Sequence, residues 1–265
     1  DGLPGQPALC AIATSGGVQC LSTALPALSA DAPSTGSFSV LRLTAPSNPT
    51  ACALDSQGAI VCWGDDTYSL VSGAPTGVGY SDLTLSGYTG CAIQAGAIDC
   101  WGSPTSGPEV LNDVPSVGTF TSVVVGDYTG CAVDVSGQLL CWGQAFFLSD
   151  YPSPSGGGWS GLSYVNGTFC AADVGGDLQC WGVAGVGPNT SGQVDSATAG
   201  GGTCGIDATG TIECWSYLGS DEALGTEAPT GSGFTDLSGG SPAFCALDGT
   251  GHIGCWGGLY FDMHW

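Results

Sequence analysis

One short phrase recurs seven times along the 265 residues, and it constrains the fold more than any other feature. In its fullest form it reads Cys52-Ala-Leu-Asp, a turn that ends at Gly58, and then Ala-Ile-Val-Cys62-Trp63-Gly64. The first cysteines of successive copies lie 34 to 42 residues apart. A regular period in this range indicates β-propeller blades, in which each repeat forms one supersecondary unit.

Each copy of the phrase has the pattern of a β-hairpin. Two short apolar segments flank a turn rich in Gly, Asp and Ser, such as Asp55-Ser-Gln-Gly58. Because Cys52 and Cys62 are equidistant from the centre of the turn, they occupy opposed positions, where side chains come close enough for a disulfide. In the copy that begins at Cys91, the turn and the cysteine spacing are both one residue shorter, so the same register holds.

We therefore predict one disulfide within each repeat, each worth about 2.5–3 kcal/mol in the chain-entropy model. The predicted pairs are Cys10–Cys20, Cys52–Cys62, Cys91–Cys100, Cys131–Cys141, Cys170–Cys180, Cys204–Cys214 and Cys245–Cys255. Metal or redox sites are the alternative, but paired thiols without a nearby histidine make poor ones. Regular pairing of all 14 cysteines indicates an oxidising compartment, so we expect a protein that is secreted or displayed on a cell surface. The start at Asp1 without methionine leads us to expect that a signal peptide was removed.

A further strand is expected 10 to 14 residues before every phrase except the first. These segments are Phe38–Leu41, Tyr80–Leu83, Phe120–Val123, Trp159–Leu162, Val194–Ala197 and Phe234–Leu237. The first repeat has no room for one, and a spare copy stands at the other end of the chain. We therefore expect one all-β domain over residues 1–265, a seven-bladed propeller closed by pairing of its N- and C-terminal segments. The closing residues in this prediction are Tyr260, Phe261, His264 and Trp265.

The repeated residues other than cysteine are expected to be structural. A tryptophan follows the second cysteine in six repeats, and its recurrence predicts a place in the core. The aspartates Asp55, Asp134, Asp173, Asp207 and Asp248 recur at one position of the hairpin, where they are expected to cap the turn. We expect function to lie in what is not repeated.

The phrase Cys-Ala-Leu-Asp-x-x-Gly-x-Ile-x-Cys-Trp-Gly resembles the regulator of chromosome condensation repeat, over about residues 8 to 258. The resemblance implies a seven-bladed propeller that mostly binds proteins. The period near 40 is similar to that of bacterial members such as the propeller-type β-lactamase inhibitor protein. The paired cysteines resemble a variant found in secreted bacterial proteins. The family does not by itself settle the function.

The charge balance excludes some partners. There are 23 acidic residues against a single basic one, Arg42, and the net charge is −22. Nucleic acid is therefore not an expected partner, because phosphate binding needs Lys or Arg. No apolar segment approaches the roughly 18 residues of a membrane span. The negative charge instead favours binding of cations or of a basic partner, or it serves only to keep the protein in solution.

Candidate site residues are few. Loops between repeats carry aromatic residues that suit recognition on a rigid scaffold, and we expect an interface among them. They are Tyr68, Phe146, Phe147, Tyr151, Tyr217 and Tyr260. The adjacent acidic pairs Asp65-Asp66 and Asp221-Glu222 are candidate calcium ligands, although the chain has no Asp-x-Asp-x-Asp-Gly loop. Asn166 and Asn189 begin glycosylation sequons.

The sequence favours a non-enzymatic extracellular structural or protein-recognition module, acting alone or as a repeating subunit of a surface coat or filament. No organic cofactor is expected. Two alternatives stay open. One is an inhibitor-like binder of a single protein partner. The other is a hydrolase that uses paired carboxylates.

Overall fold

The computed structural model describes residues 8–22, 26–44, 48–106, 108–165, 167–175, 178–182, 193–199, 202–207, 209–216, 228–240 and 243–256. These residues are nearly all-β, as predicted, and they form seven sheets. The chain divides into two compact units. One comprises residues 1–135 and 140–145, and the other comprises residues 136–139 and 146–265.

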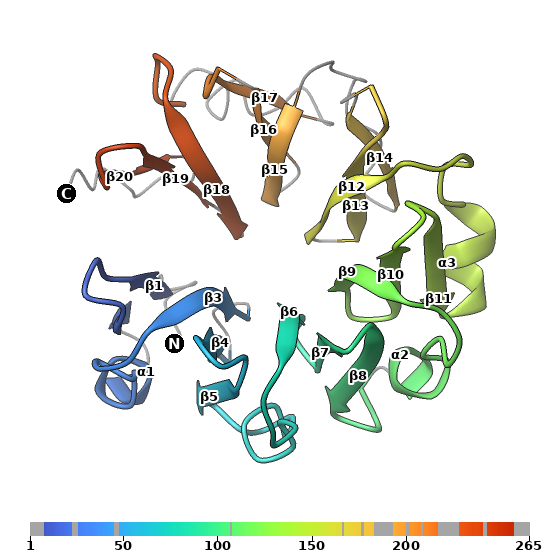
Figure 1. Cartoon of the computed structure of the whole chain (residues 1–265), viewed down its shortest axis with the longest axis horizontal. Helices are drawn as coiled ribbons and strands as arrows, with labels where there is room; N and C mark the ends of the chain where they lie inside the picture. Colours follow the sequence, from blue (N-terminus) through green and yellow to red (C-terminus); the bar gives the residue numbers. More distant parts are fainter. Residues whose placement is uncertain are drawn as a thin grey trace, which may run out of the picture. The chain divides into compact units, whose positions relative to one another are not determined.

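The first unit contains four sheets and two short helices, drawn in blue to green in Figure 1. The sheets are β1 (Ala8–Ile12) with β2 (Val18–Ser22); β3 (Phe38–Leu43), β4 (Thr50–Asp55) and β5 (Ile60–Gly64); β6 (Tyr80–Leu85), β7 (Thr89–Gln94) and β8 (Ala97–Gly102); and β9 (Phe120–Val125), β10 (Thr129–Asp134) and β11 (Leu139–Gly143). The helices α1 (Pro26–Ala30) and α2 (Pro108–Asn112) connect successive sheets.

The second unit contains three sheets, which follow the helix α3 (Ala145–Asp150). They are β12 (Ser160–Val165), β13 (Thr168–Ala172) and β14 (Leu178–Gly182); β15 (Gln193–Ala199), β16 (Gly202–Asp207) and β17 (Ile212–Ser216); and β18 (Phe234–Gly240), β19 (Ala243–Asp248) and β20 (Ile253–Trp256). The predicted extra strand is therefore present in every repeat from the second to the seventh. The segment predicted to complete the first sheet, residues 259–265, lies outside the described residues.

All seven predicted disulfides are confirmed, and each joins neighbouring strands of one sheet. The pairs are Cys10–Cys20, Cys52–Cys62, Cys91–Cys100, Cys131–Cys141, Cys170–Cys180, Cys204–Cys214 and Cys245–Cys255. Their Cα atoms lie 4.0 to 4.1 Å apart, because opposed residues of an antiparallel pair are brought together by the ladder itself. The shortened third repeat keeps this register, with Cys91 directly opposite Cys100.

The predicted aspartate cap of the hairpin turn is confirmed at Asp55, Asp173, Asp207 and Asp248. Oδ1 of Asp55 accepts hydrogen bonds from the backbone N–H groups of Gln57 and Ala59, both at 2.8 Å. Asp207 and Asp248 cap their turns in the same way, and these hydrogen bonds lower the pKa of both carboxyls. These aspartates are thus structural acceptors.

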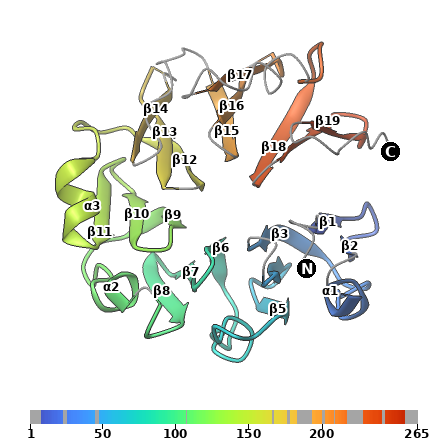
Figure 2. The ribbon, with the colours of Figure 1, turned by 180° about the vertical axis from the view of Figure 1, so that it is seen from behind.

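Hydrophobic cores lie between neighbouring sheets of a unit. One core combines Cys52 and Leu54 of β4 with Leu83 of β6 and Trp101 of β8. The first strands β3, β6 and β9 lie side by side, while α1, α2 and the third strands β5, β8 and β11 lie on the opposite side of the unit (Figures 1 and 2). Within the units, the disulfide-bonded hairpins β1–β2, β4–β5, β7–β8 and β16–β17 therefore pack against the sheet of the next repeat.

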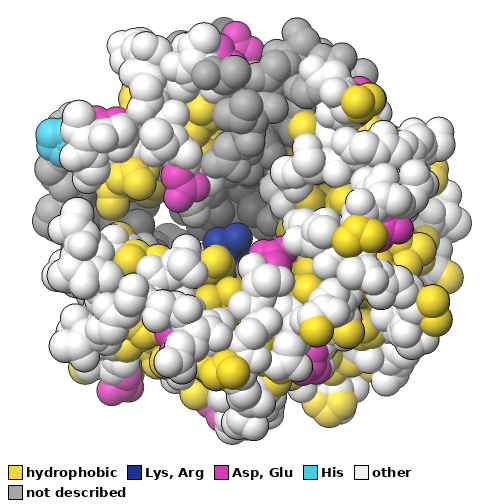
Figure 3. Space-filling view, in the orientation of Figure 1, with side chains coloured by type: hydrophobic (Ala, Val, Ile, Leu, Met, Phe, Trp, Pro, Cys, Tyr) yellow, Lys and Arg dark blue, Asp and Glu magenta, His cyan; other side chains and the backbone are white. Residues whose placement is uncertain are grey.

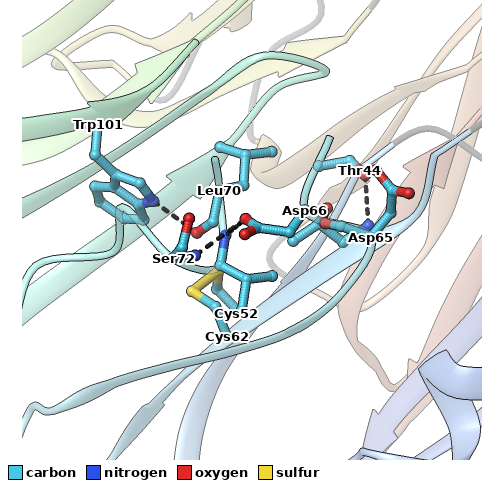
Figure 4. Close-up of a disulfide and its surroundings, with 10 residues drawn as sticks. Thr44, Cys52, Cys62, Asp65, Asp66, Leu70, Ser72 and Trp101 are labelled. Carbon is cyan, nitrogen blue, oxygen red and sulfur yellow. Dashed lines mark hydrogen bonds between the residues drawn. A yellow bond between two sulfur atoms is a disulfide. The ribbon is translucent and has the colours of Figure 1, made fainter. Parts of the chain in front are cut away.

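The predicted core role of the tryptophans holds for the five whose side chains are described, and all five are buried. They are Trp63, Trp101, Trp142, Trp181 and Trp256. The indole N–H of Trp101 donates to the carbonyl oxygen of Leu70 at 2.9 Å, beside the Cys52–Cys62 disulfide (Figure 4). Trp63 and Trp142 make the equivalent bond to helices α1 and α2. These bonds fasten the connecting segments to the sheets.

A second set of hydrogen bonds joins successive repeats. The backbone N–H of Tyr80, which begins β6, donates to the carbonyl oxygen of Gly58 in the preceding hairpin turn at 3.0 Å. Four further pairs share this arrangement, namely Gly16–Phe38, Gly96–Phe120, Gly137–Trp159 and Gly210–Phe234. The aromatic residue recognised in the sequence thus marks the point where one repeat is hydrogen-bonded to the next.

Candidate interaction surface

Three tyrosines of the first unit come from loops that lie at the same ends of neighbouring sheets. Tyr68 belongs to the loop between β5 and β6, Tyr88 to the turn between β6 and β7, and Tyr128 to the turn between β9 and β10. We call these three residues, together with Asp127, the tyrosine surface. Its tyrosines are half-buried or exposed, and 44% of Tyr128 is accessible.

Tight turns hold two of these tyrosines. The backbone N–H of Ser86 donates to the carbonyl oxygen of Thr89 at 2.8 Å, which leaves only Gly87 and Tyr88 in the loop. Gly126 and Thr129 make the same bond at 2.7 Å around Asp127 and Tyr128. Two-residue hairpin loops have little conformational freedom, so the sheets present these side chains in defined positions.

The rings of Tyr68 and Tyr88 are in contact. Their centroids lie 4.7 Å apart and the ring planes are inclined at 85°, so the edge of one ring meets the face of the other. This is a favourable arrangement for two aromatic quadrupoles. Both side chains are only half-buried, so solvent reaches part of each residue.

Asp127 joins the two turns. Its Oδ1 accepts the backbone N–H of Gly87 at 3.2 Å, from a residue 40 positions earlier in the chain. Burial raises the pKa of Asp127, and the Gly87 hydrogen bond offsets only part of that effect. The negative charge of Asp127 in turn is the largest cause of a raised pKa at Tyr88, to which burial also contributes. A partly buried carboxylate is therefore held beside the turn of Tyr88, close enough for its charge to raise the pKa of that phenol.

Two other aromatic residues of the predicted interface are described by the structure, and both belong to the second unit. Phe147 lies in α3 and Tyr151 directly follows that helix, both half-buried in the second unit. The side chain of Phe146 and all of Tyr217 and Tyr260 lie outside the described residues. The same holds for Phe261, His264 and Trp265 and for the sequon residues Asn166 and Asn189.

Asp65 and Asp66, the calcium candidates that the structure describes, are used as hydrogen-bond acceptors within their own loop. Oδ1 of Asp65 accepts the N–H of Thr67 at 2.9 Å, and Oδ1 of Asp66 accepts the N–H of Ser72 at 3.0 Å (Figure 4). Burial raises the pKa of each carboxyl, but these bonds outweigh it and the net shift is downward. Asp221 and Glu222 lie outside the described residues. Within the described part of the chain, no group of three or more His, Cys, Asp or Glu side chains could hold a metal ion.

Asp82 of β6 forms a second charged feature, between two sheets. The strand has a bulge between Tyr80 and Asp82, which resets the alternation of its side chains. Oδ2 of Asp82 accepts a hydrogen bond from the backbone N–H of Val123 in β9 at 2.9 Å. Oδ1 accepts one from the backbone N–H of the next residue, Leu83, also at 2.9 Å. A side chain thus supplies a hydrogen bond between sheets that no backbone ladder joins.

Arg42 of β3 is the basic group that acts on Asp82. Burial raises the pKa of Asp82, and the Val123 hydrogen bond and the positive charge of Arg42 each counteract part of that shift. The single dark blue side chain in Figure 3 is Arg42, since the sequence has no other Lys or Arg. An acidic side chain lies close to it on the same face (Figure 3).

Replacing Arg42 should therefore destabilise the protein only where Asp82 is ionised. A carboxyl with a raised folded pKa favours the folded state below its ordinary value of 3.8, and that advantage is lost as the pH rises through the folded pKa. The positive charge of Arg42 reduces this loss of stability at neutral pH. Arg42→Gln should therefore lower the free energy of unfolding by about 0.5–1 kcal/mol at pH 7 and by almost nothing near pH 3. Thermal unfolding at both pH values measures this.

The Asp82→Asn background is the control for that experiment, because it removes the charge on which Arg42 acts. The effect of Arg42→Gln at pH 7 should largely disappear there. An equal loss in both backgrounds would contradict the assigned interaction.

Sequence reasoning missed Tyr88, Tyr128, Asp127 and Asp82 as candidates. The signal for two of them was present, because Tyr88-Thr-Gly-Cys and Tyr128-Thr-Gly-Cys stand at the same repeat position. Their repetition was interpreted as structural, and a tyrosine that recurs immediately before a strand was not considered for display at a turn. For Asp82 and Asp127, the partners lie about 40 residues away and leave no local pattern.

No protein-family model matches the chain, and no curated protein matches it. Several solved structures, in contrast, are similar to the chain. The chain is similar to the CRINKLY WD40 ectodomain of the Arabidopsis thaliana receptor kinase ACR4, with 19% identity, a TM-score of 0.75, and coverage of 100% of this chain and 96% of that one. It is also similar to the ectodomain of the Physcomitrella patens receptor kinase CR4, with 24% identity, a TM-score of 0.66, and coverage of 84% and 64%.

A third similar structure is Prp20p from Saccharomyces cerevisiae, described with its binding to Gsp1p and histones. The identity is 12%, the TM-score is 0.65, and the coverage is 97% of this chain and 82% of Prp20p. The seven sheets, the seven disulfides within repeats and these similarities define the fold as a seven-bladed β-propeller. Disulfides of this number are typical of proteins in an oxidising environment. Among the described residues, no helix is long and apolar enough to cross a membrane.

Proposed function

We propose that the chain is a secreted, non-enzymatic module that recognises a basic protein partner through the tyrosine surface. The observation that carries the proposal is Tyr128, an exposed aromatic side chain at the tip of a two-residue turn beside Tyr88. Tyrosine is enriched among the residues that dominate protein interfaces, because its large ring is buried at a low cost in conformational entropy. Loops on a rigid scaffold are the usual place for such residues.

The charge of the chain supports a basic partner. A net charge of −22 attracts positively charged proteins over several ångströms and repels acidic ones, nucleic acids and anionic membranes. The seven disulfides support a role in an oxidising environment. Receptor ectodomains and the histone-binding Prp20p are among the similar structures, and we carry protein binding over from them as part of this proposal.

Capture from the extracellular fraction of the source organism tests the proposal. The oxidised wild-type chain should retain a basic protein at moderate salt and release it as salt increases. Tyr128→Ala should weaken the measured affinity for that protein about tenfold or more, because a central tyrosine is lost. Tyr151→Ala, a half-buried tyrosine of the second unit, is the matched control and should bind like the wild type.

Two results would contradict the proposal. One is equal binding by wild type and Tyr128→Ala. The other is concentration-dependent self-association of the purified chain in light scattering with no heterologous partner, which would favour a repeating subunit of a coat or filament.

A further inference from the structure

We propose that the tyrosine surface binds the ammonium group of a lysine side chain presented by the partner, with Asp127 as its counter-ion and the tyrosine rings as cation–π contacts. This inference rests on the proposed function, and it names the chemical group that the surface recognises.

The first step of the argument is the charge of Asp127. The described structure gives this carboxylate one hydrogen-bond donor, the Gly87 N–H, and no ion pair. The only basic residue of the whole sequence, Arg42, acts on Asp82 instead. A partly desolvated carboxylate with one donor is stabilised by a cation brought from outside.

The rings around Asp127 have the chemistry to hold that cation. Tyr68 and Tyr88 are in ring contact, and Asp127 accepts the N–H of Gly87, the residue before Tyr88, so two phenol rings and one carboxylate lie close together. The charges of Asp127, Tyr68 and Tyr128 each help to raise the pKa of Tyr88. Cations are attracted to the faces of tyrosine rings within about 6 Å of the centroid. The mutually perpendicular rings of Tyr68 and Tyr88 do not form a parallel platform for a flat ligand, and they favour a compact one.

The hydrogen bond to Gly87 favours lysine over arginine. A guanidinium group binds best when both oxygens of a carboxylate face its fork of N–H groups. Oδ1 of Asp127 already accepts the Gly87 N–H, so Oδ2 is left as the main acceptor. A point-like ammonium group needs one oxygen and ring faces, which is what this surface offers.

The probe for the test is n-butylammonium chloride, which carries the end of a lysine side chain. The chain has only 8 tyrosines, so their ring signals can be followed by NMR on the oxidised protein, with Tyr→Phe variants to assign them. We expect the signals of Tyr68, Tyr88 and Tyr128 to shift and saturate at constant ionic strength. n-Butanol should leave them unchanged, and n-butylguanidinium should bind more weakly.

Two variants identify the groups responsible. Asp127→Asn should weaken n-butylammonium binding about fivefold or more, whereas the exposed control Asp113→Asn, which makes the same change of charge, should not. Tyr128→Phe should retain binding, because the ring remains, while Tyr128→Ala should lose it. Affinity should also fall as the pH drops through the raised pKa of Asp127, and this dependence should be absent from Asp127→Asn.

Tighter binding of n-butylguanidinium, or the absence of shifts with n-butylammonium, would overturn the inference. If the tyrosine surface captures a protein but not n-butylammonium, this inference alone fails. If n-butylammonium binds and no protein does, the proposed function fails and the cation site stands. Binding of a neutral sugar at the same rings, insensitive to Asp127→Asn, would replace the lysine with a glycan.

Discussion

Reduction of all seven disulfides is expected to unfold this protein at room temperature without any denaturant. Each bond closes a loop of 9 or 10 residues, and in the chain-entropy model it stabilises the folded state by about 2.5–3 kcal/mol. Seven of them amount to about 17–21 kcal/mol, whereas the whole stability of a domain is typically about 5–15 kcal/mol. The disulfides therefore contribute more than the whole free energy of unfolding that is typical of a domain.

The reductant has to reach buried sulfur atoms, since Cys52 and Cys91 are fully buried. The protein is reduced in guanidinium, diluted into buffer with reductant, and followed by far-UV circular dichroism and tryptophan fluorescence. Oxidised protein carried through the same steps is the control and should regain its spectrum. A cooperative thermal transition after all 14 thiols have been detected would contradict the prediction.

Gly58→Ala is the substitution outside the disulfides for which we expect the largest loss of stability, about 3 kcal/mol or more. Gly58 has a φ of +72°, where a side chain is strained, and a Cβ there would lie 2.5 Å from the carbonyl oxygen of Tyr80. The Tyr80 oxygen and the next nearest atom, the Tyr80 nitrogen at 2.8 Å, both belong to the backbone, so relief requires that the hairpin turn move away from the next sheet. That movement would break the Tyr80–Gly58 hydrogen bond between repeats.

Gly79→Ala is the matched control, because it separates backbone strain from the steric clash. Gly79 has a similar φ of +86°, but a Cβ there meets nothing within 4 Å. Gly79→Ala should lower the free energy of unfolding only by the strain of a left-handed residue, about 1–2 kcal/mol. Urea denaturation of the two variants and the wild type compares the free energies of unfolding. Equal losses would show that the packing of the turn against β6 contributes little.

Most of the fold could be predicted because the interactions that specify it join residues close to one another in the sequence. The Cys52–Cys62 register follows from counting outward from a turn, and it survives the deletion in the repeat of Cys91 because the missing residue is taken from the turn. The aspartate caps involve residues two to four positions apart, as in Asp55 with Gln57 and Ala59. Such patterns are visible in a single sequence.

The helices and the candidate surface could not be predicted in the same way. The five- and six-residue helices α1, α2 and α3 are too short to have a periodic pattern, and packing stabilises them, as in the bond from Trp63 to α1. Phe146-Phe147-Leu148 was expected in a loop and lies in α3. Tyr88 and Tyr128 were passed over because repetition indicates structure, yet their turns place phenol rings where solvent reaches them.

The sequence by itself determined the repeat, the number of sheets, the disulfide pairing and the acidic charge, because each depends on composition or on residues within about one hairpin of each other. Only the tertiary structure decided which groups meet between repeats. Asp127 reaches Gly87 and Asp82 reaches Val123 across some 40 residues, and Tyr68 meets Tyr88 across a strand. Those contacts arise when successive sheets pack face to face, and no local pattern in the chain encodes them.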